Sequence, residues 1–391
     1  RGALRAVLRR LDQRLALLAS ATAEANSMRM LLRQTAVCLA LLDESAAAAS
    51  RWLRVAALGD RSALAETRRL LGGLLSGGQH EQARRLVEAE LKRCPPEHSA
   101  PLRVALGEVL LRSGRPSEAL GQLELALLKD DELPAAHALL GQILGAQGRS
   151  ADRSRALAHL LAAGESPELS PKEAGECALL AARLLLCDDA GELSELPLAT
   201  GLPRSGEIAR QAERLLLRAI ELLDRDPRPL RLLIRHHTAQ QQPERALSLC
   251  DALLDVASTA EDRAAALFQK SQLTTDGAQS INLLHESLQH DAGYLPALSA
   301  LRIRAEVEGD NSAALGWLSR EIAASPSDGE RAELLLKQAE LLHPQHQAEL
   351  AITTLRKAMQ LGSVRAAQRL GELLFARGEL LQAADVAGRA A

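Results

Sequence analysis

The sequence lacks the features that would place it in a membrane, in a sheet fold or on nucleic acid. No uninterrupted apolar span reaches the roughly 18 residues that a membrane helix requires. Apolar and polar residues do not alternate over runs of strand length, so we expect no β-sheet. The net charge is -3, from 47 basic and 50 acidic residues. The chain therefore has neither a global basic field for nucleic acid nor a polyanionic tail.

Residues arranged for catalysis or metal binding are also missing. The five cysteines include no C-x2-C pair, which argues against a zinc site. Cys177 and Cys187 are too far apart for a disulfide along one straight helix. The adjacent side chains of His236 and His237 do not converge on one ion. The nucleotide-loop, serine-hydrolase and zinc-protease motifs are absent. We therefore expect no enzyme activity, no cofactor and no metal site.

What the chain does contain is a repeat of 34 residues. A leucine recurs at this spacing, and it is followed by a small residue after 13 positions and an apolar residue after 17. The three series are Leu233, Leu267, Leu301 and Leu335; Ala246, Ser280, Ala314 and Ala348; and Cys250, Leu284, Leu318 and Ile352. This period indicates a unit of two amphipathic helices. Such units bury their apolar faces by stacking, each contacting only its neighbours.

The repeated residues match the pattern of a known family. Leu106-Gly107, Leu110 and Gly114 return 34 residues later as Leu140-Gly141, Leu144 and Gly148. These positions resemble the tetratricopeptide repeat, whose pattern is W-x2-L-G-x2-Y, then A-x3-F, then P. Leu, Ala or Ser stand at most of the family's aromatic places, since only 1% of the residues are aromatic. The resemblance implies an all-α fold, a right-handed α-solenoid of about ten helix-turn-helix repeats.

Small residues and glycines of the pattern have physical roles of their own. Ala119 and Ala314 are expected where two helices meet closely, because a larger side chain would push the backbones apart. Glycine at the fifteenth place of a unit can adopt the left-handed conformation that ends a helix. These glycines are Gly78, Gly114, Gly148, Gly309 and Gly378.

The repeat frame divides the chain into four parts. We expect a lead-in helix or truncated repeat over 1-28, repeats over 29-171, an irregular repeat over 172-226 with an inserted loop at 188-206, and repeats over 227-391. The ten units start near residues 29, 64, 100, 134, 172, 227, 261, 295, 329 and 364. The unit from 134 is expected to carry a short insertion before a second helix at 153-163. Inserted loops often lie on a binding face of repeat proteins, but a functionally silent loop is an equal alternative.

Candidate binding residues follow from the family resemblance. In the family, the concave groove is lined mainly by the first helix of each repeat, at its second, fifth, ninth and twelfth places. Carried over, this implies Arg228, Arg231 and Arg235, whose spacing places them on one helical face. Three guanidiniums favour a carboxylate or another anionic partner. The neighbouring units contribute Asp262, Gln269, Gln272, Ile303, Glu306, Glu333, Lys337 and Glu340. The alternative is a solvated face whose arginines pair with acids such as Asp226 or Glu244.

Two function classes remain open. The first is a non-catalytic protein-interaction scaffold that binds a peptide or protein in the groove, including an acidic segment, or that docks subunits of a larger assembly. The second is a regulatory or targeting segment of a larger enzyme or secretion machine. The chain begins with Arg1 and stops at Ala391 inside an expected helix, so we expect a longer polypeptide. The scattered cysteines favour the cytoplasm, but a truncated N-terminus leaves the periplasm open.

Overall fold

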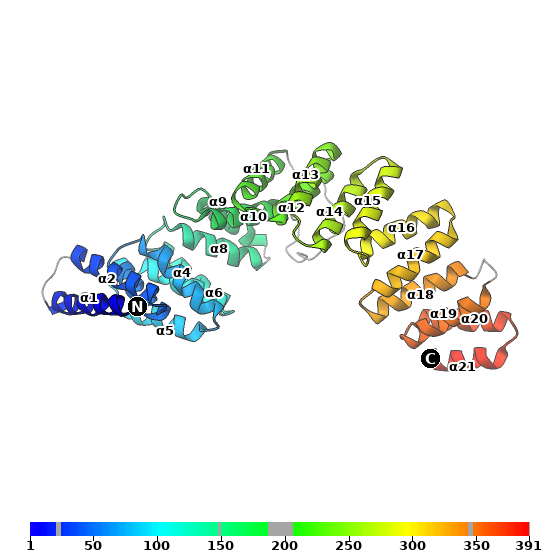
Figure 1. Ribbon diagram of the computed structural model, residues 1–391, viewed down its shortest axis with the longest axis horizontal. Helices are drawn as coiled ribbons and strands as arrows, with labels where there is room; N and C mark the ends of the chain where they lie inside the picture. The colour runs from blue at the N-terminus through cyan, green and yellow to red at the C-terminus, as the bar shows by residue number, and fades with distance from the viewer. Residues whose placement is uncertain (21–24, 148–149, 187–205, 343–346, 391) are drawn as a thin grey trace. The chain divides into compact units, whose positions relative to one another are not determined.

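The computed structural model describes residues 1–20, 25–147, 150–186, 206–342 and 347–390. Over these residues the fold is all-α, with twenty-one α-helices, one short 3-10 helix (Pro96–His98) and no strand. Within each of the two compact units described below, consecutive helices pack against one another along the chain (Figure 1). The all-α class and the sequential helix pairs are as the sequence predicts, whereas the handedness of the solenoid stays a prediction.

After the single helix α1 (Gly2–Ser20), the helices form ten pairs of a first and a second helix. The first helices are α2 (Ala25–Leu41), α4 (Ala63–Ser76), α6 (Ala100–Arg112), α8 (Pro134–Ala146), α10 (Pro171–Leu186), α12 (Pro227–Ala239), α14 (Ala260–Leu273), α16 (Leu295–Glu308), α18 (Asp328–Leu342) and α20 (Val364–Ala376). The second helices are α3 (Ser45–Ala57), α5 (His80–Arg93), α7 (Pro116–Leu127), α9 (Ser150–Gly164), α11 (Gly206–Leu222), α13 (Pro243–Val256), α15 (Gly277–His290), α17 (Asn311–Ala324), α19 (Ala348–Gln360) and α21 (Leu380–Ala390).

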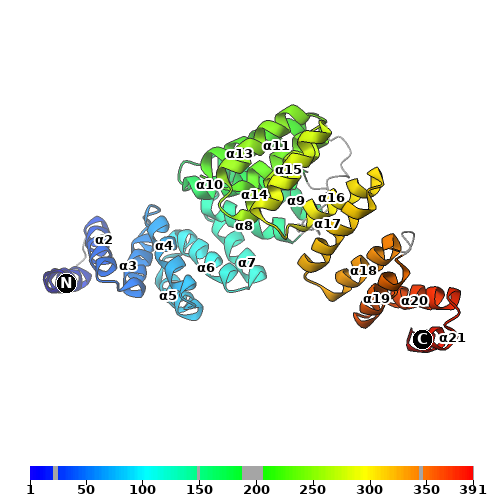
Figure 2. The ribbon, with the colours of Figure 1, turned by 45° about the vertical axis from the view of Figure 1, so that its right-hand side comes forward.

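The chain divides into two compact units, which we call the first unit (Arg1–Asp224) and the second unit (Arg225–Ala391). The core of the first unit is a continuous series of leucines, alanines and valines that extends from α1 to α10. In the second unit, one apolar cluster joins α18 to α21, and another gathers around α15 and α16 with Phe268, Tyr294 and Trp317 at its edge. Figure 2 shows the paired helices of each unit from a second direction.

Close contacts between the two helices of a pair explain the glycines of the repeat. A Cβ atom on Gly107 would lie 2.7 Å from Cγ of Leu123, and one on Gly141 would lie 2.5 Å from Cγ of Leu160. No real Cβ contact is that short, so the leucine of the second helix occupies the space that the glycine leaves. The glycine and the leucine are thus a complementary pair across the helix interface.

Left-handed residues end the first helices, as the glycine pattern predicts. Gly78, Gly114, Gly309 and Gly378 have φ between 75° and 80°, whereas Gly148 lies outside the described residues. In two further repeats the fifteenth place holds Asp43 (φ 66°) and Gln241 (φ 57°). The glycine pattern did not identify these two turns. A side chain in this region is strained, because its Cβ approaches the following carbonyl oxygen.

Replacing Gln241 by glycine is therefore expected to stabilise the second unit. Removing the Cβ relieves about 1–2 kcal/mol of strain, and this exceeds the cost of about 0.5–1 kcal/mol that the extra freedom of glycine in the unfolded chain brings. The free energy of unfolding, measured by urea denaturation, should rise for Gln241→Gly. The neighbouring change Gln240→Gly is the control, because Gln240 has φ -83°. A rise for Gln240→Gly, or a fall for Gln241→Gly, would contradict this explanation.

Two irregular parts of the repeat frame were predicted, an insertion in the unit from 134 and a loop at 188-206. The expected insertion before the second helix of the unit from 134 is wrong, because α9 already begins at Ser150. The additional residues lengthen α9 itself, which has 15 residues where α7 has 12. Of the predicted loop 188-206, residues 188–205 lie outside the described part of the chain, and Gly206 is the first residue of α11.

The expectation that each repeat contacts only its neighbours is wrong in the first unit. Arg68 of α4 forms an ion pair with Glu173 of α10 at 2.7 Å, although the pairs α6–α7 and α8–α9 lie between them in sequence. Packed helices are about 8–10 Å apart, so three such steps in a straight line would exceed the reach of the two side chains. The first helices of this unit must therefore converge.

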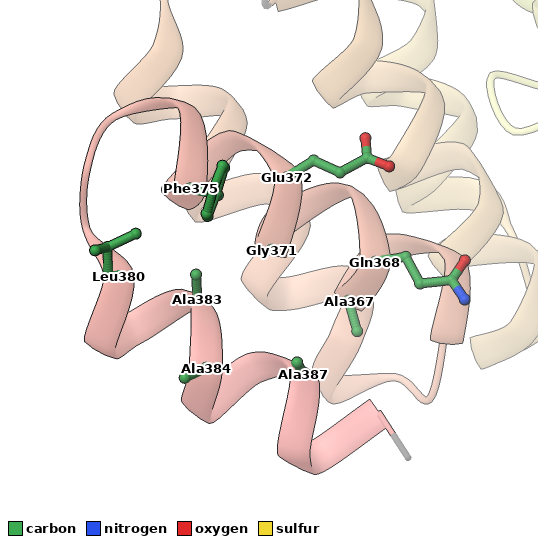
Figure 3. A pocket seen from close by; sticks show the side chains of 9 residues that line it. All are labelled: Ala367, Gln368, Gly371, Glu372, Phe375, Leu380, Ala383, Ala384 and Ala387. Atoms are coloured by element: carbon green, nitrogen blue, oxygen red, sulfur yellow. The ribbon is translucent and has the colours of Figure 1, made fainter.

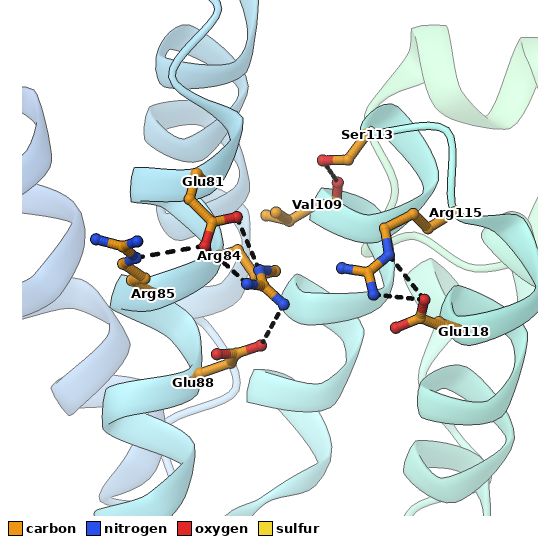
Figure 4. Close-up of polar contacts among 8 residues, drawn as sticks. All are labelled: Glu81, Arg84, Arg85, Glu88, Val109, Ser113, Arg115 and Glu118. Atoms are coloured by element: carbon orange, nitrogen blue, oxygen red, sulfur yellow. Dashed lines mark hydrogen bonds and ion pairs between the residues drawn. The ribbon is translucent and has the colours of Figure 1, made fainter.

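Many exposed charges are neutralised within their own helix or turn. On α5, Arg84 lies 2.7 Å from Glu81 and 3.4 Å from Glu88, and at the start of α7 Arg115 lies 2.6 Å from Glu118 (Figure 4). Such pairs contribute little to folding because water screens them. They do leave the surface of these second helices close to neutral.

Candidate interaction face

The helix α12 presents its three predicted arginines opposite a buried apolar side. Pro227 occupies the first turn, and the Asp226 carboxylate caps the helix by accepting a hydrogen bond from the Arg228 amide at 2.8 Å. Leu230, Leu233 and Ile234 are buried against the rest of the second unit. Arg228 and Arg235 are exposed and Arg231 is half-buried.

Two of the three arginines already have carboxylate partners. The Arg228 guanidinium lies 2.6 Å from Asp226, and that of Arg231 lies 2.7 Å from Asp262 on α14. Partial burial raises the pKa of Asp226. The hydrogen bonds from Arg228 lower it further than burial raises it, so the pKa of Asp226 lies below its usual range. The Thr259 hydroxyl, and then Arg231, lower the pKa of Asp262. Within the described residues Arg235 forms no ion pair, so it carries the excess positive charge of this helix.

Ion pairs between first helices join the predicted groove places into one surface. Arg231–Asp262 links the fifth place of α12 to the second place of α14, and Glu333–Arg365, at 3.7 Å, links the same places of α18 and α20. Glu306 and Lys337, 3.8 Å apart, link the twelfth place of α16 to the ninth of α18. We call the residues at these four places of α12, α14, α16, α18 and α20 the first-helix face. These ion pairs between first helices were not predicted from the sequence, although the place numbers alone could have matched Arg365 with Glu333.

The remaining predicted residues add polar and apolar groups to the first-helix face. On α14, Gln272 is exposed and Gln269 is half-buried. The Oε1 atom of Gln269 is buried and accepts no hydrogen bond from the described residues. On α16, Ile303 is 49% exposed, and Val307, which lies beside the face one turn later, is 82% exposed. Glu340 of α18 is also exposed. The face therefore offers a cation, amide groups, a carboxylate and a small apolar contact.

At three equivalent places of the first unit, charged side chains are paired with one another. Arg68 contacts both Glu108, at 2.6 Å, and Glu173, and Glu108 also contacts Arg112 at 2.8 Å. Burial works against its charge, but the two carboxylates hold the pKa of Arg68 above its usual value. Because Arg68 and Glu108 are mostly buried, this part of the first unit offers few charges to a partner.

Groups suited to metal or thiol chemistry do not gather in the described part of the chain. No cluster of three or more His, Cys, Asp or Glu side chains could hold a metal ion there. Burial raises the pKa of Cys177 and of Cys250 to about 11, so neither is a ready thiolate near neutral pH. Among the helices that are described, none is long and apolar enough to cross a membrane.

One titratable pair stands out in the first unit. His137 Nε2 donates a hydrogen bond to the Asp131 carbonyl oxygen at 2.8 Å, which leaves Nδ1 of a neutral His137 as an acceptor. His159 Nδ1 lies 2.8 Å from that atom and is therefore the donor. Burial, then His137 and Arg155, lower the pKa of His159. If both rings were protonated, two N–H groups would face each other.

The histidine pair should make the stability of the first unit depend on pH. Because the pKa of His159 is lowered on folding, the unfolded chain binds a proton more readily than the folded chain. Stability is then fully present above about pH 6.5, the usual value for histidine, and is lost as the pH falls below it. His159→Asn keeps a donor near the Nδ1 position but does not titrate. Its melting temperature should fall less between pH 7 and pH 5 than that of the wild type, and an equal fall would contradict this role for the pair.

Comparison with known proteins identifies no close relative. No protein-family model and no curated protein sequence matches the chain. Among solved structures, PilF of Pseudomonas aeruginosa is 18% identical, with a TM-score of 0.44 over 63% of this chain and 97% of that one. A tetratricopeptide repeat protein of Parabacteroides merdae is 13% identical, with a TM-score of 0.38 over 81% and 98%. YrrB, a TPR protein with an unusual peptide-binding site, is 15% identical, with a TM-score of 0.40 over 51% and 91%. These scores are too low to assign a ligand, so the tetratricopeptide type rests on the period and helix pairs of the chain itself.

Proposed function

We propose that this tetratricopeptide-type array is a non-catalytic protein-interaction scaffold, and that its first-helix face binds an acidic segment of a protein partner around Arg228, Arg231 and Arg235. The observation that carries the proposal is Arg235, an exposed guanidinium without an ion-pair partner among the described residues, on the same helical face as two other arginines. Carboxylates of a partner would form charge-assisted hydrogen bonds with it.

The internal partners of Arg228 and Arg231 set the strength of this interaction. Asp226 and Asp262 offset two of the three positive charges, so the local excess is small. A guanidinium carries five N–H donors, and the one recorded hydrogen bond from Arg231, to Asp262, does not exhaust them. We therefore propose a short acidic segment that also places an apolar residue against Ile303 and Val307, rather than a polyanion.

Reversing the three charges should abolish most of this binding. Exposed charge contacts are worth about 0.5 kcal/mol each, so three of them give about a tenfold change in Kd, and repulsion by the new glutamates adds to it. Arg228→Glu, Arg231→Glu and Arg235→Glu are combined in one variant. The matched control combines Arg245→Glu, Arg320→Glu and Arg356→Glu, three exposed arginines on the second helices α13, α17 and α19.

Both variants and the wild type are used as baits in extracts of the source organism. The proposal predicts that the control recovers the partners of the wild type and that the α12 variant does not. The melting temperature of the control should match that of the wild type, because exposed charges contribute little to folding. That of the α12 variant should fall only slightly, because among its three changes only Arg231→Glu breaks an ion pair between helices. Recovery of the same partners by the α12 variant would show that the arginines form only a solvated face.

A further inference from the structure

The second and fifth places of the first helices are closed in the middle of the first unit and open in the second unit. The residues at these places of α6 and α8 are all buried: Pro101, Val104, Ala135 and Ala138. On the five first helices of the second unit, the residues at the second, fifth, ninth and twelfth places are all described, and none of them is buried. On α20, three of these places even line an open hollow beside α21 (Figure 3), namely Gln368, Glu372 and Phe375.

Two ion pairs between distant parts of the first unit accompany this closure. Arg68 on α4 lies 2.7 Å from Glu173 at the start of α10. Arg61, just before α4, lies 2.6 Å from Asp130, which precedes α8. Within the described residues, α4 and α10 do not pack against each other as neighbouring helices do, so side chains make the link between them. The N-terminal ends of α4, α8 and α10 are therefore held close to one another, at the end of the helices where the second and fifth places lie.

Glu173 is positioned for this link by the cap of its own helix. Its Oε2 atom accepts hydrogen bonds from the Ser170 hydroxyl at 2.7 Å and from the Ser170 amide at 3.1 Å, and the Glu173 amide donates to the Ser170 hydroxyl oxygen at 3.3 Å. This is a reciprocal capping box. The other carboxylate oxygen, Oε1, is the one that meets Arg68. Burial raises the pKa of Glu173, but Arg68 and then Ser170 lower it by more, so the pKa lies below its usual value.

We propose that the Arg68–Glu173 ion pair is a latch that holds the first unit closed at α6 and α8, and that its release lets α4 and α10 separate and makes Val104 and Ala138 accessible. The side chains of Arg68 and Glu173 are 15% and 36% exposed, so water and salt reach the pair and can break it. After release, Arg68 keeps Glu108 at 2.6 Å and Glu173 keeps its capping box. Neither charge is then left without a partner, so the open form is accessible to the folded chain. The latch lies in the first unit and does not depend on the arginines of α12.

The test measures how often a thiol in place of Val104 meets the solvent. The probe is Val104→Cys in the full chain, and its alkylation by iodoacetamide is followed by mass spectrometry of the peptide that contains it. Val109→Cys is the matched probe, because Val109 is also a valine of α6 with no exposed surface, but at the tenth place of the repeat. Alkylation at position 109 reports the opening of the unit as a whole.

The variant Glu173→Gln removes the ion pair and keeps the helix cap, because glutamine also serves in a capping box. Alkylation at position 104 should become about fivefold faster in this variant, as expected for the loss of one ion pair, and alkylation at position 109 should not change. Glu168→Gln is the control, since Glu168 is exposed shortly before α10 and forms no ion pair among the described residues. High salt should also speed alkylation at position 104 when Glu173 is present, but not in Glu173→Gln.

Two results would overturn the proposal. One is alkylation at position 104 that is equally fast with Glu173, with Glu173→Gln and with Glu168→Gln, at low and at high salt. The other is an increase at position 109 as large as that at position 104, which would mean that Glu173→Gln destabilises the whole unit rather than opening a latch.

Discussion

Replacing Arg302 by methionine is expected to lower the free energy of unfolding of the second unit by about 3–5 kcal/mol. Arg302 on α16 is 5% exposed and Glu321 on α17 is 7% exposed. Arg302 Nε donates to Glu321 at 2.7 Å, and another of its nitrogens donates to Glu306 at 2.7 Å. Burial disfavours the charge, but Glu321 and Glu306 hold the pKa of Arg302 above its usual value. Without Arg302, the Glu321 carboxylate is left buried and unpaired.

A second variant separates the loss of charge from the loss of packing. Arg302→Met combined with Glu321→Met removes both charges, and replacing a whole buried pair by apolar side chains is often neutral. The double variant should therefore recover most of the stability that Arg302→Met loses. A double variant that is as unstable as Arg302→Met would mean that shape, rather than the unpaired carboxylate, dominates.

The chain provides a convenient signal for this measurement. It contains two tryptophans, Trp52 in the first unit and Trp317 in the second. Trp317 lies on α17, one turn before Glu321. In a Trp52→Phe background, urea denaturation followed by fluorescence therefore reports on the second unit alone.

The substitutions Ala119→Leu and Ala314→Leu are each expected to cost about 1–3 kcal/mol of stability. Ala119 on α7 and Ala314 on α17 have no exposed surface. Added methylene groups would force the helices of the pair apart or drive side chains out of their rotamers. Ala323→Leu is the matched control, because Ala323 is exposed on the same helix as Ala314, and its effect should lie within about 0.5 kcal/mol.

Thermal melts and urea denaturation of these variants test the register of the repeat. If Ala314→Leu and Ala119→Leu were as stable as the control, the small residues of the repeat would not mark close helix contacts. The two sites lie in different units, so their effects should be additive when combined.

The regular part of the fold could be predicted because each repeat carries its own residues that mark the buried side and the end of a helix. The leucine series places the buried side of the helices, and the glycine at the fifteenth place ends the first helix. The sequence placed the unit from 227 at the residue where α12 begins, and the unit from 295 where α16 begins. Helix periodicity and turn residues act locally, so they can be interpreted without knowledge of the tertiary structure.

Substitutions within the pattern were harder to interpret. Arg302 and Glu321 stand at places that hold Gly107 and Ala126 in an earlier repeat, and the structure shows that they form a buried ion pair. These two departures from the pattern in one repeat could have indicated the ion pair.

Charge pairing and curvature could not be predicted at all from the period. Asp262 was placed in the groove by its position, but its ion pair with Arg231 depends on how α14 lies against α12. The Arg68–Glu173 pair depends on small rotations accumulated over several repeats. A sequence period fixes the unit and its length, whereas these rotations follow from side-chain packing between units.

The most direct test of the proposed binding role is a titration of the recovered partner against three forms of the protein at two salt concentrations. The forms are the wild type, the α12 variant with three glutamates, and the control variant of the second helices. Exposed charges are screened over about 8 Å at physiological ionic strength. The first-helix face predicts that the wild type and the control bind alike and lose affinity as salt rises, and that the α12 variant binds at least about tenfold more weakly at low salt. Equal affinity of all three forms at both salt concentrations would contradict the assignment of binding to Arg228, Arg231 and Arg235.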